Sequence, residues 1–314
     1  MKSITDERFR DLYIGPDYAD VKNLNESREL MPVPSEFSED VDALRQLCDE
    51  IRVQSNRPRF SIRRNESLYR VTCFDTTGGR PTFVIRQPRS EVMPWEKVEL
   101  GVKDKEFLMQ KDLRGAVIIC GEMGSGKTTL ASSLVVARLV TYGDIAVAIE
   151  DPPETALDGR HGNGRCIHVD PRGNVSGELE NAVRSGASII YLGEARDQDS
   201  TIPVISAANN GHFILSTTHA SSEADAVMRL VNMCDGRYEN AAHALASGLA
   251  AVIHVRLVAK KVNTPVGEKI IDKLEYSMLK VWKDTTVKGH IRAQNYHLLG
   301  QAGEQQKTVS RAGE

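Results

Sequence analysis

Residues 121–128 combine residue types and spacing that suit the binding of phosphate groups. The run Gly121-Glu122-Met123-Gly124-Ser125-Gly126-Lys127-Thr128 matches the pattern G-x-x-x-x-G-K-[ST] at every fixed position. In such a loop the glycines let backbone N–H groups surround a phosphate, the lysine supplies charge for the β- and γ-phosphates, and the threonine hydroxyl can ligate Mg²⁺. We therefore expect ATP and Mg²⁺ as ligands, with these contact residues: Gly121, Gly124, Ser125, Gly126, Lys127, Thr128 and Thr129.

The segments on either side of this run have the character of a strand and a helix. Residues 116–120 form an apolar strand candidate, and residues 129–139 form a helix candidate. A strand before the loop and a helix after it are the context that the phosphate pattern requires. The N-terminal end of that helix would also favour a bound anion, because its backbone N–H groups point toward it.

Chemically active side chains follow three other predicted strands. The strand at 145–149 ends in Glu150, the strand at 189–192 leads to Glu194, and the strand at 213–217 leads to His219. In an open parallel sheet, ligands bind beyond the carboxyl ends of the strands. One carboxylate could orient or deprotonate water, another could hold Mg²⁺, and an imidazole near the γ-phosphate could couple hydrolysis to a change of shape. The alternative is that these are solvated turn residues.

The elements that must position these residues indicate an α/β fold with a mostly parallel sheet. Apolar strands alternate with helical segments between residues 113 and 221, which is typical of βαβ units. After residue 221 the pattern becomes helical, and a strand pair at 251–258 and 277–282 closes the domain. We assign this domain to residues 113–299 and expect a disordered tail at 300–314, because the tail is rich in Gln, Gly and Glu.

The N-terminal part of the chain predicts a separate, small α+β domain at residues 1–89. Residues 1–37 are polar and are expected to be irregular, with prolines as breakers. A helix at 38–52 precedes three strand candidates, and residues 90–112 are expected to be a linker with a short helix. The strand candidates are 59–63, 68–74 and 82–86.

Composition and charge exclude several classes of protein. The formal net charge is −3 and the sequence pI is about 6.3, so no general affinity for nucleic acid or for anionic membranes is expected. No apolar run approaches the roughly 20 residues of a membrane helix, and the charged N-terminus lacks a signal-peptide core. We therefore expect a cytoplasmic protein.

The cysteines and two clustered histidines predict neither disulfides nor a metal centre. The chain has five cysteines and no CxxC pair, so the thiols are expected to be free and structural. His161 and His168 flank a glycine-rich stretch, but no companion ligands have suitable spacing for a metal. The cysteines are Cys48, Cys73, Cys120, Cys166 and Cys234.

Four segments together resemble the type II/IV secretion ATPase superfamily (GspE/PilT-like), and in particular its PilT-like branch. They occur in the order of that family within about residues 70–257: GEMGSGKTT, IAVAIEDPPE, IIYLGEARD and GHFILSTTHASSEADAVMRL. The resemblance implies a RecA-like P-loop ATPase domain preceded by a PAS-like N-terminal domain. By the same resemblance, Glu194 is the catalytic glutamate, Glu150 helps to hold the metal and water, and His219 matches the histidine box, with His212 as a second match.

The resemblance also implies an assembly and a set of partners. Arg70 and Arg86 lie in LYRVTCF and TFVIRQP, which resemble N-domain strands whose arginines reach nucleotide, including that of a neighbouring subunit. The family forms hexameric rings at the cytoplasmic face of the inner membrane, docked there through a platform protein. The implied function is a homohexameric ATPase motor for type IV pilus assembly or retraction, or for protein secretion.

Some features depart from the family pattern and leave other functions open. The histidine box reads TTHA rather than TLHT, Arg184-Ser185 stands where an acidic residue and proline are usual, and the chain has no tetracysteine motif. The missing tetracysteine motif argues against the typical assembly and type II export branches. The sequence also has no C-terminal AIRxLIR motif, which is typical of retraction motors, so retraction itself is not indicated. Two alternatives remain: a nucleic-acid translocase on a RecA-like core, and a regulatory subunit that binds ATP without hydrolysing it.

Overall fold

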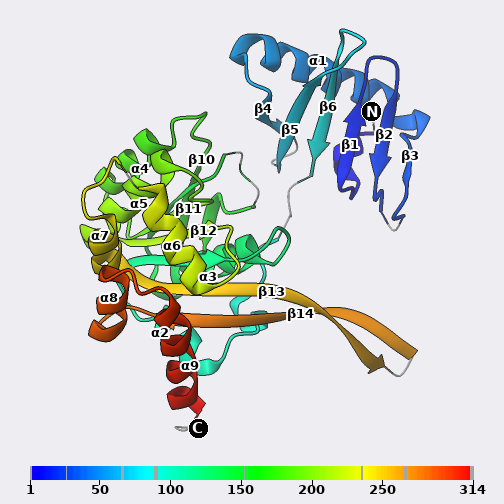
Figure 1. Ribbon diagram of the computed structural model, residues 1–314. Coiled ribbons are helices and arrows are strands. Elements are labelled where there is room, and N and C mark those ends of the chain that lie inside the picture. The colour runs from blue at the N-terminus through cyan, green and yellow to red at the C-terminus, as the bar shows by residue number, and fades with distance from the viewer. Residues whose placement is uncertain are drawn as a thin grey trace. The chain divides into compact units, whose positions relative to one another are not determined.

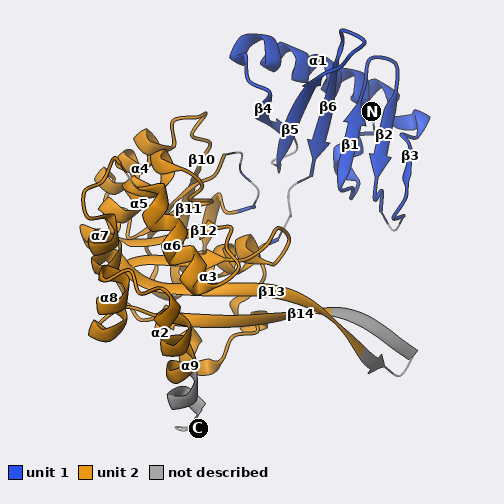
Figure 2. Cartoon of the chain, viewed as in Figure 1, with its two compact units in different colours: residues 1–91, 152–156 blue, residues 92–151, 157–314 orange. Residues whose placement is uncertain are grey.

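The computed structural model describes two compact units within the chain. It describes residues 2–25, 27–64, 67–87, 91–151, 153, 155–234, 236–264 and 267–311. Unit 1 comprises residues 1–91 and 152–156, and unit 2 comprises residues 92–151 and 157–314 (Figure 2). None of the described helices is both long and apolar enough to cross a membrane.

Unit 1 is a six-stranded antiparallel sheet with the long helix α1 packed on it. The strand order is β3-β2-β1-β6-β5-β4. Alternate residues of β5, Tyr69, Val71 and Cys73, are buried against Leu44 of α1, which gives a small α+β core. The elements are β1 Asp11–Ile14, β2 Ala19–Lys22, β3 Leu30–Pro32, α1 Ser38–Ser55, β4 Arg59–Arg64, β5 Ser67–Asp75 and β6 Pro81–Arg86.

The expectation that residues 1–37 are irregular is wrong. This segment contains three strands, and Leu12, Ile14 and Val21 are fully buried. Each strand has only three or four residues, so the alternation of apolar and polar positions is too short to stand out in the sequence. Their order depends on long-range pairing, because β1 bonds to β6 with Leu12 opposite Ile85.

Unit 2 is built on an eight-stranded sheet that is parallel except at its two edges. The order is β14-β13-β7-β12-β11-β8-β10-β9, with β14 and β9 antiparallel to their neighbours. Figure 1 shows β13 and β14 side by side. This confirms the mostly parallel sheet that the alternating pattern predicts; β9 and β10 are strands that the pattern does not predict. The strands are β7 Gly115–Cys120, β8 Ile145–Ile149, β9 Gly159–His161, β10 Gly164–Val169, β11 Ile189–Leu192, β12 Phe213–Thr218, β13 Leu249–Thr264 and β14 Gly267–Lys280.

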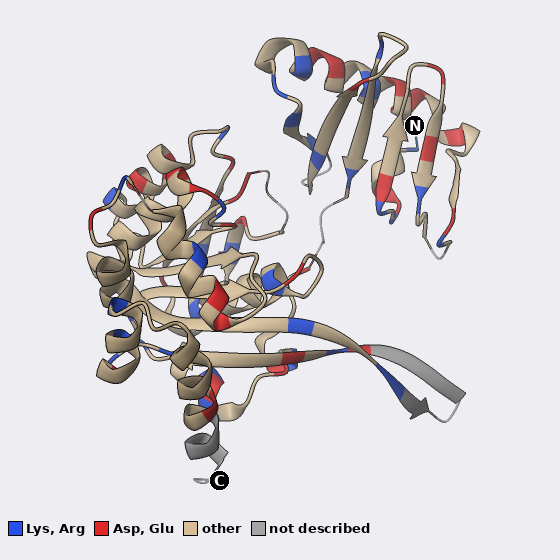
Figure 3. Cartoon of the chain, viewed as in Figure 1, with Lys and Arg blue, Asp and Glu red and all other residues tan. Residues whose placement is uncertain are grey.

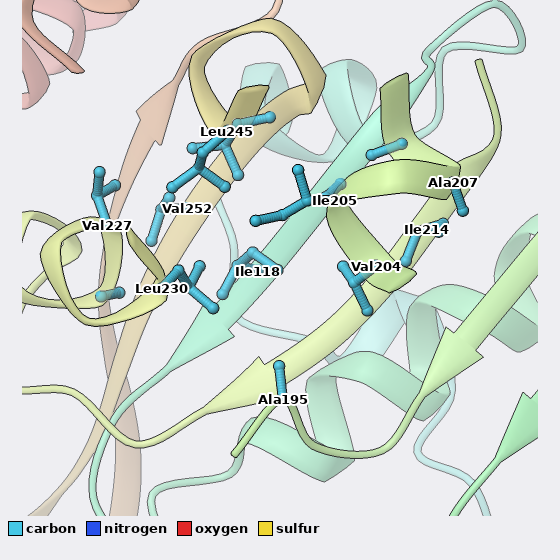
Figure 4. Packing of buried hydrophobic residues seen from close by; sticks show 14 of the residues in the cluster. Ile118, Ala195, Val204, Ile205, Ala207, Ile214, Val227, Leu230, Leu245 and Val252 are labelled. Carbon is cyan, nitrogen blue, oxygen red and sulfur yellow. The ribbon is translucent and has the colours of Figure 1, made fainter. Parts of the chain in front are cut away.

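Helices cover both faces of this sheet, which explains why its central strands are continuously apolar. On one face, Ile118 of β7 packs with Val204 of α5 and Leu230 of α6 (Figure 4). On the other face, Ile119 packs against Leu134 of α3. The helices are α2 Val102–Leu108, α3 Lys127–Tyr142, α4 Val175–Arg184, α5 Gln198–Asn209, α6 Glu223–Met233, α7 Ala241–Gly248, α8 Thr285–Arg292 and α9 His297–Arg311.

The segment expected to be a linker is packed into unit 2 over most of its length. Phe107 and Leu108 of α2 are buried in the core on the α3 side of the sheet. Arg138 of α3 donates hydrogen bonds to the carbonyl oxygens of Leu108 (2.7 Å) and Gln110 (3.1 Å), and it stacks on Phe213. Burial lowers the pKa of Arg138 to about 10, so the guanidinium stays charged at neutral pH. These bonds fix the end of α2 and the turn after it to the helix that follows the phosphate loop.

The tail expected to be disordered from residue 300 continues helix α9 to Arg311. The side chain of Gln306 accepts a hydrogen bond from the N–H of Lys280 and donates one to its carbonyl, both at 2.9 Å. These bonds join the helix to the end of β14, a contact that composition alone does not reveal. Residues 312–314 lie outside the described part of the chain.

The five cysteines are free and buried, which leads to a simple chemical prediction. Burial raises the pKa of Cys48 and Cys166 to about 12 and that of Cys234 to about 11, and it also raises the pKa of Cys73 and Cys120. Because the thiolate is the reactive form, we expect a thiol reagent such as DTNB to label native protein slowly and all five cysteines after unfolding. A rapidly labelled cysteine in native protein would contradict this.

Candidate active site

The phosphate loop joins the buried strand β7 to helix α3, and its backbone requires glycine. Gly126 precedes the helix with φ of 96°, in the left-handed region. A Cβ atom on Gly121 would stand 2.2 Å from the carbonyl oxygen of Val255, so β13 leaves no room for a side chain there. The loop therefore presents backbone rather than side chains at the point where β7 ends.

Lys127 is the buried cation of the loop. Its side chain is close to fully buried, and Nζ donates hydrogen bonds to the carbonyl oxygens of Gly121 (2.9 Å) and Glu122 (2.7 Å). These two contacts hold the ammonium group inside the loop, at the point where β7 ends. A lysine in this position can also contact the phosphates of a nucleotide.

Ser125 supplies a second observation that fits a phosphate. Its hydroxyl is buried and has no hydrogen-bond partner among the residues that the structure describes. It lies 2.6 Å from the position that a Cβ on Gly121 would occupy, so it packs against the backbone at the start of the loop. A buried hydroxyl without a partner costs free energy, and a phosphate oxygen would satisfy it. Thr128 and Thr129 follow in the first turn of α3.

The sheet brings the three predicted strand ends to the edge where this loop lies. Thr218, the last residue of β12, pairs with Cys120, the last residue of β7. Leu192 of β11 pairs with Ile149 of β8, and the strands run parallel. Glu150, Glu194 and His219, one or two residues beyond these ends, therefore occupy one edge of the sheet together with the phosphate loop.

Glu194 and His219 form a pair that solvent can reach. His219 Nε2 lies 3.3 Å from Glu194 Oε1, and the two side chains are 42% and 38% exposed. The loops that carry them are joined by the hydroxyl of Thr217, which donates to the carbonyl of Gly193 at 2.6 Å. An accessible carboxylate next to an imidazole can hold a water molecule and take its proton.

Glu150 differs from Glu194 because it is buried and in contact with other polar groups. Its side chain is 4% exposed, Oε1 accepts a hydrogen bond from the Tyr191 hydroxyl at 3.2 Å, and Oε2 lies 2.9 Å from His168 Nε2. Sequence reasoning identified Glu150 but not these two neighbours. Tyr191 could have been found from its position in the sequence, because it lies within a predicted strand that ends beside the site.

The structure does not bring His212 to this site. His212 precedes the first residue of β12, and Phe213 pairs with Gly115 at the start of β7. His212 is thus at the opposite edge of the sheet from His219, about 20 Å away at the rise of a strand. The second match to the histidine box is therefore wrong as a site residue, although the box itself lies on β12 as expected.

Arg70 and Arg86 belong to unit 1, where they are direct neighbours. They are paired across β5 and β6, and Arg86 Nε donates to Asp11 Oδ1 at 2.6 Å. Asp11 is buried, while Arg86 keeps 48% of its side chain exposed. Their contact with a nucleotide stays a prediction.

A cavity of about 830 Å³ is lined by residues of β13 and β14 and by residues 99–104. Leu274 lines it, and one of its methyl carbons lies 3.6 Å from the position of a Cβ on Gly126. Tyr276, another lining residue, accepts a hydrogen bond from the N–H of Gly101 and donates one to Asp104, which joins β14 to the segment before α2. A cavity of this size can hold a ligand as large as a nucleoside.

Curated relatives of this chain act in pili and secretion. It is 32% identical over 197 residues to the type IV pilus retractation ATPase PilT of Pseudomonas aeruginosa, covering 61% of this chain and 56% of that protein. It is 30% identical over 206 residues to the putative type II secretion system protein E of Escherichia coli, covering 64% of this chain and 39% of that protein. The chain thus spans about half or less of the length of these relatives.

Solved structures share the fold over nearly the whole chain. The pilus retraction motor PilT with bound ADP matches with a TM-score of 0.74 at 20% identity, covering 95% of this chain and 86% of that one. The Legionella pneumophila ATPase DotB matches with a TM-score of 0.73 at 20% identity, covering 96% and 88%. The family model described as "Type II/IV secretion system protein" matches residues 41–301, and the chain therefore belongs to the type II/IV secretion system protein family.

Proposed function

We propose that the chain is the subunit of a motor that hydrolyses ATP at the phosphate loop. The observation that carries the proposal is one edge of the sheet where a buried lysine, a buried hydroxyl without a described partner and an accessible Glu–His pair meet. Lys127 and Ser125 suit the phosphates, and Glu194 with His219 suits the attacking water. The family to which the chain belongs supports this reading.

Each residue has a distinct chemical task in this proposal. Lys127 exchanges its carbonyl partners for phosphate oxygens and neutralises charge that develops during transfer. Glu194 orients the attacking water and accepts its proton, while His219 beside it responds to the γ-phosphate. Thr128 and Glu150 would hold Mg²⁺, which supplies further positive charge at the phosphates when bound.

We place the base and ribose in the 830 Å³ cavity of β13, β14 and residues 99–104. Leu274 lines this cavity and lies 3.6 Å from the position of a Cβ on Gly126, which supports a nucleotide that extends from the loop toward the cavity. The cavity lies within unit 2. All residues that line it belong to unit 2, so nucleoside binding there would require no residue of unit 1.

The proposed assembly is a cytoplasmic homohexamer that works on a membrane-embedded platform protein. Relatives named for pilus retraction, pilus assembly and type II secretion support coupling of ATP hydrolysis to a pilus or to protein export. Along the coloured part of the ribbon, Lys and Arg alternate with Asp and Glu (Figure 3), which favours a motor over a nucleic-acid translocase.

Light scattering combined with an ATPase assay tests this proposal. We expect a particle of six subunits in the presence of ATP and turnover that does not depend on DNA or RNA. A monomer whose turnover requires nucleic acid would favour the translocase. Tight ATP binding with no turnover, with or without liposomes that carry the platform protein, would favour the regulatory subunit.

Arg86→Ala is expected to lower turnover of the assembled protein at least about tenfold, with little change in ATP affinity, if Arg86 acts at the nucleotide of a neighbouring subunit. Asp11 would lose the 2.6 Å contact but keep Arg10, whose Nε lies 3.5 Å from its other oxygen. Arg80→Ala, at an exposed turn of the same unit, is the matched control. An unchanged rate in assembled Arg86→Ala would remove this arginine from the site.

A further inference from the structure

A buried cluster of three polar side chains surrounds the carboxylate of Glu150. Tyr191 donates a hydrogen bond to Oε1 at 3.2 Å, and His168 Nε2 lies 2.9 Å from Oε2. The side chains of Glu150 and His168 are 4% and 5% exposed, and Tyr191 is fully buried. A carboxylate at this depth is costly unless its oxygens are paired. Oε1 accepts the hydrogen bond of Tyr191, whereas His168 Nε2 lies close to Oε2 in a geometry that is not a hydrogen bond.

The register of three adjacent strands creates this cluster. His168 of β10 and Tyr191 of β11 both pair with Ala148 of β8, one from each side. Glu150 lies two residues beyond Ala148 and so belongs to the same face of the sheet. The small side chain of Ala148 leaves space between its two large neighbours, and the carboxylate of Glu150 lies within reach of both.

The path of the Glu150 side chain also depends on the segment that carries Glu194. A Cβ on Gly193 would stand 2.9 Å from Cγ of Glu150, so the side chain of Glu150 packs directly against the backbone of Gly193. Gly193 is followed at once by Glu194. The orientation of the buried carboxylate and the placement of the exposed one are therefore linked through a single glycine.

We propose that His168 and Tyr191 are positioning residues that fix the orientation of the Glu150 carboxylate toward Mg²⁺ and its water. This inference rests on the proposed function, because it assumes that Glu150 acts on the metal. Contacts at both oxygens restrain rotation about the last side-chain bond of Glu150. Removing either neighbour frees the carboxylate and leaves the phosphate contacts of Lys127 untouched.

Metal binding and turnover of four variants test the proposal. Mn²⁺ binding to the complex with a non-hydrolysable ATP analogue is followed by electron paramagnetic resonance, and kcat, KM and the Mg²⁺ requirement come from ATPase assays. We expect Tyr191→Phe and His168→Ala to weaken Mn²⁺ binding and lower kcat by about tenfold, with metal-free nucleotide affinity unchanged. His168→Gln places an amide near Oε2 and should recover part of the Mn²⁺ affinity and kcat that His168→Ala loses. Glu150→Gln shows how large the loss is when the carboxylate itself is removed.

Controls separate positioning from general destabilisation. His161 lies on β9, where its imidazole contacts the carbonyl oxygen of Leu157 at 2.8 Å. The control variant His161→Gln should change neither Mn²⁺ binding nor kcat. Thermal melting identifies any variant that fails to fold. If His168→Ala does not fold, the result for Tyr191→Phe, which removes only one hydroxyl, decides between positioning and destabilisation. If Glu150→Gln weakens Mn²⁺ binding but Tyr191→Phe and His168→Ala do not, positioning is refuted and the proposed function stands. If Glu150→Gln has no effect, the assumed role of Glu150 falls and the inference falls with it.

Discussion

Lys127→Ala is expected to reduce ATP turnover by at least about 100-fold, as for the loss of a preorganised donor to a transition-state charge. The ammonium group is buried in the phosphate loop and bonded to carbonyl oxygens of that loop, so it is already in place before nucleotide arrives. Alanine removes the charge without filling the space. The measurement is steady-state hydrolysis together with equilibrium binding of a fluorescent ATP analogue.

Lys111→Ala provides the matched control for this prediction. Lys111 is exposed and precedes β7, at the opposite end of the same strand. The control should hydrolyse ATP at the normal rate. Because Lys127→Ala also removes two hydrogen bonds within the loop, at about 1 kcal/mol each, thermal melting must accompany the assay. Normal turnover in a folded Lys127→Ala protein would refute the assignment of the phosphate loop.

Glu194→Gln is expected to keep ATP binding within about threefold while lowering hydrolysis roughly 100- to 10,000-fold, the usual contribution of a general base. The change removes the charge and basicity of the carboxylate but keeps its size. Glu194 is 38% exposed and its described contact is with His219 at 3.3 Å, so the fold should tolerate the amide. Single-turnover hydrolysis measured beside nucleotide binding distinguishes chemistry from affinity.

Glu180→Gln, on the surface of α4 and paired with Arg184, is the control for the Glu194 variant. Glu180→Gln should change neither the rate of single-turnover hydrolysis nor the affinity for nucleotide. Loss of ATP binding in Glu194→Gln would instead indicate that Glu194 supports the structure of the site. An unchanged rate of hydrolysis would transfer the role of base to another group at the same edge, with Glu150 the first candidate.

The sequence by itself determined the features that are encoded over short distances. The phosphate loop depends on eight consecutive residues, and the strands beside it are apolar because both faces of the sheet are covered. Once a parallel sheet was inferred, the residues after each strand had to lie at one edge. The same argument excludes His212, because the six residues of β12 separate it from His219. The direction of the predicted strand already implied this, although the motif matched both histidines.

The tertiary structure decided the features that join residues far apart in the chain. Strands β1–β3 are too short to show a period, and the pairing of β1 with β6 joins them to the rest of the sheet. The carbonyl groups of Leu108 and Gln110 are held by Arg138, 30 and 28 positions away in the sequence. The buried setting of Glu150 arises in the same way, since Tyr191 is 41 positions away in the sequence. Local patterns specify which side chains can do chemistry, whereas burial and partners depend on register across strands, which no local pattern contains.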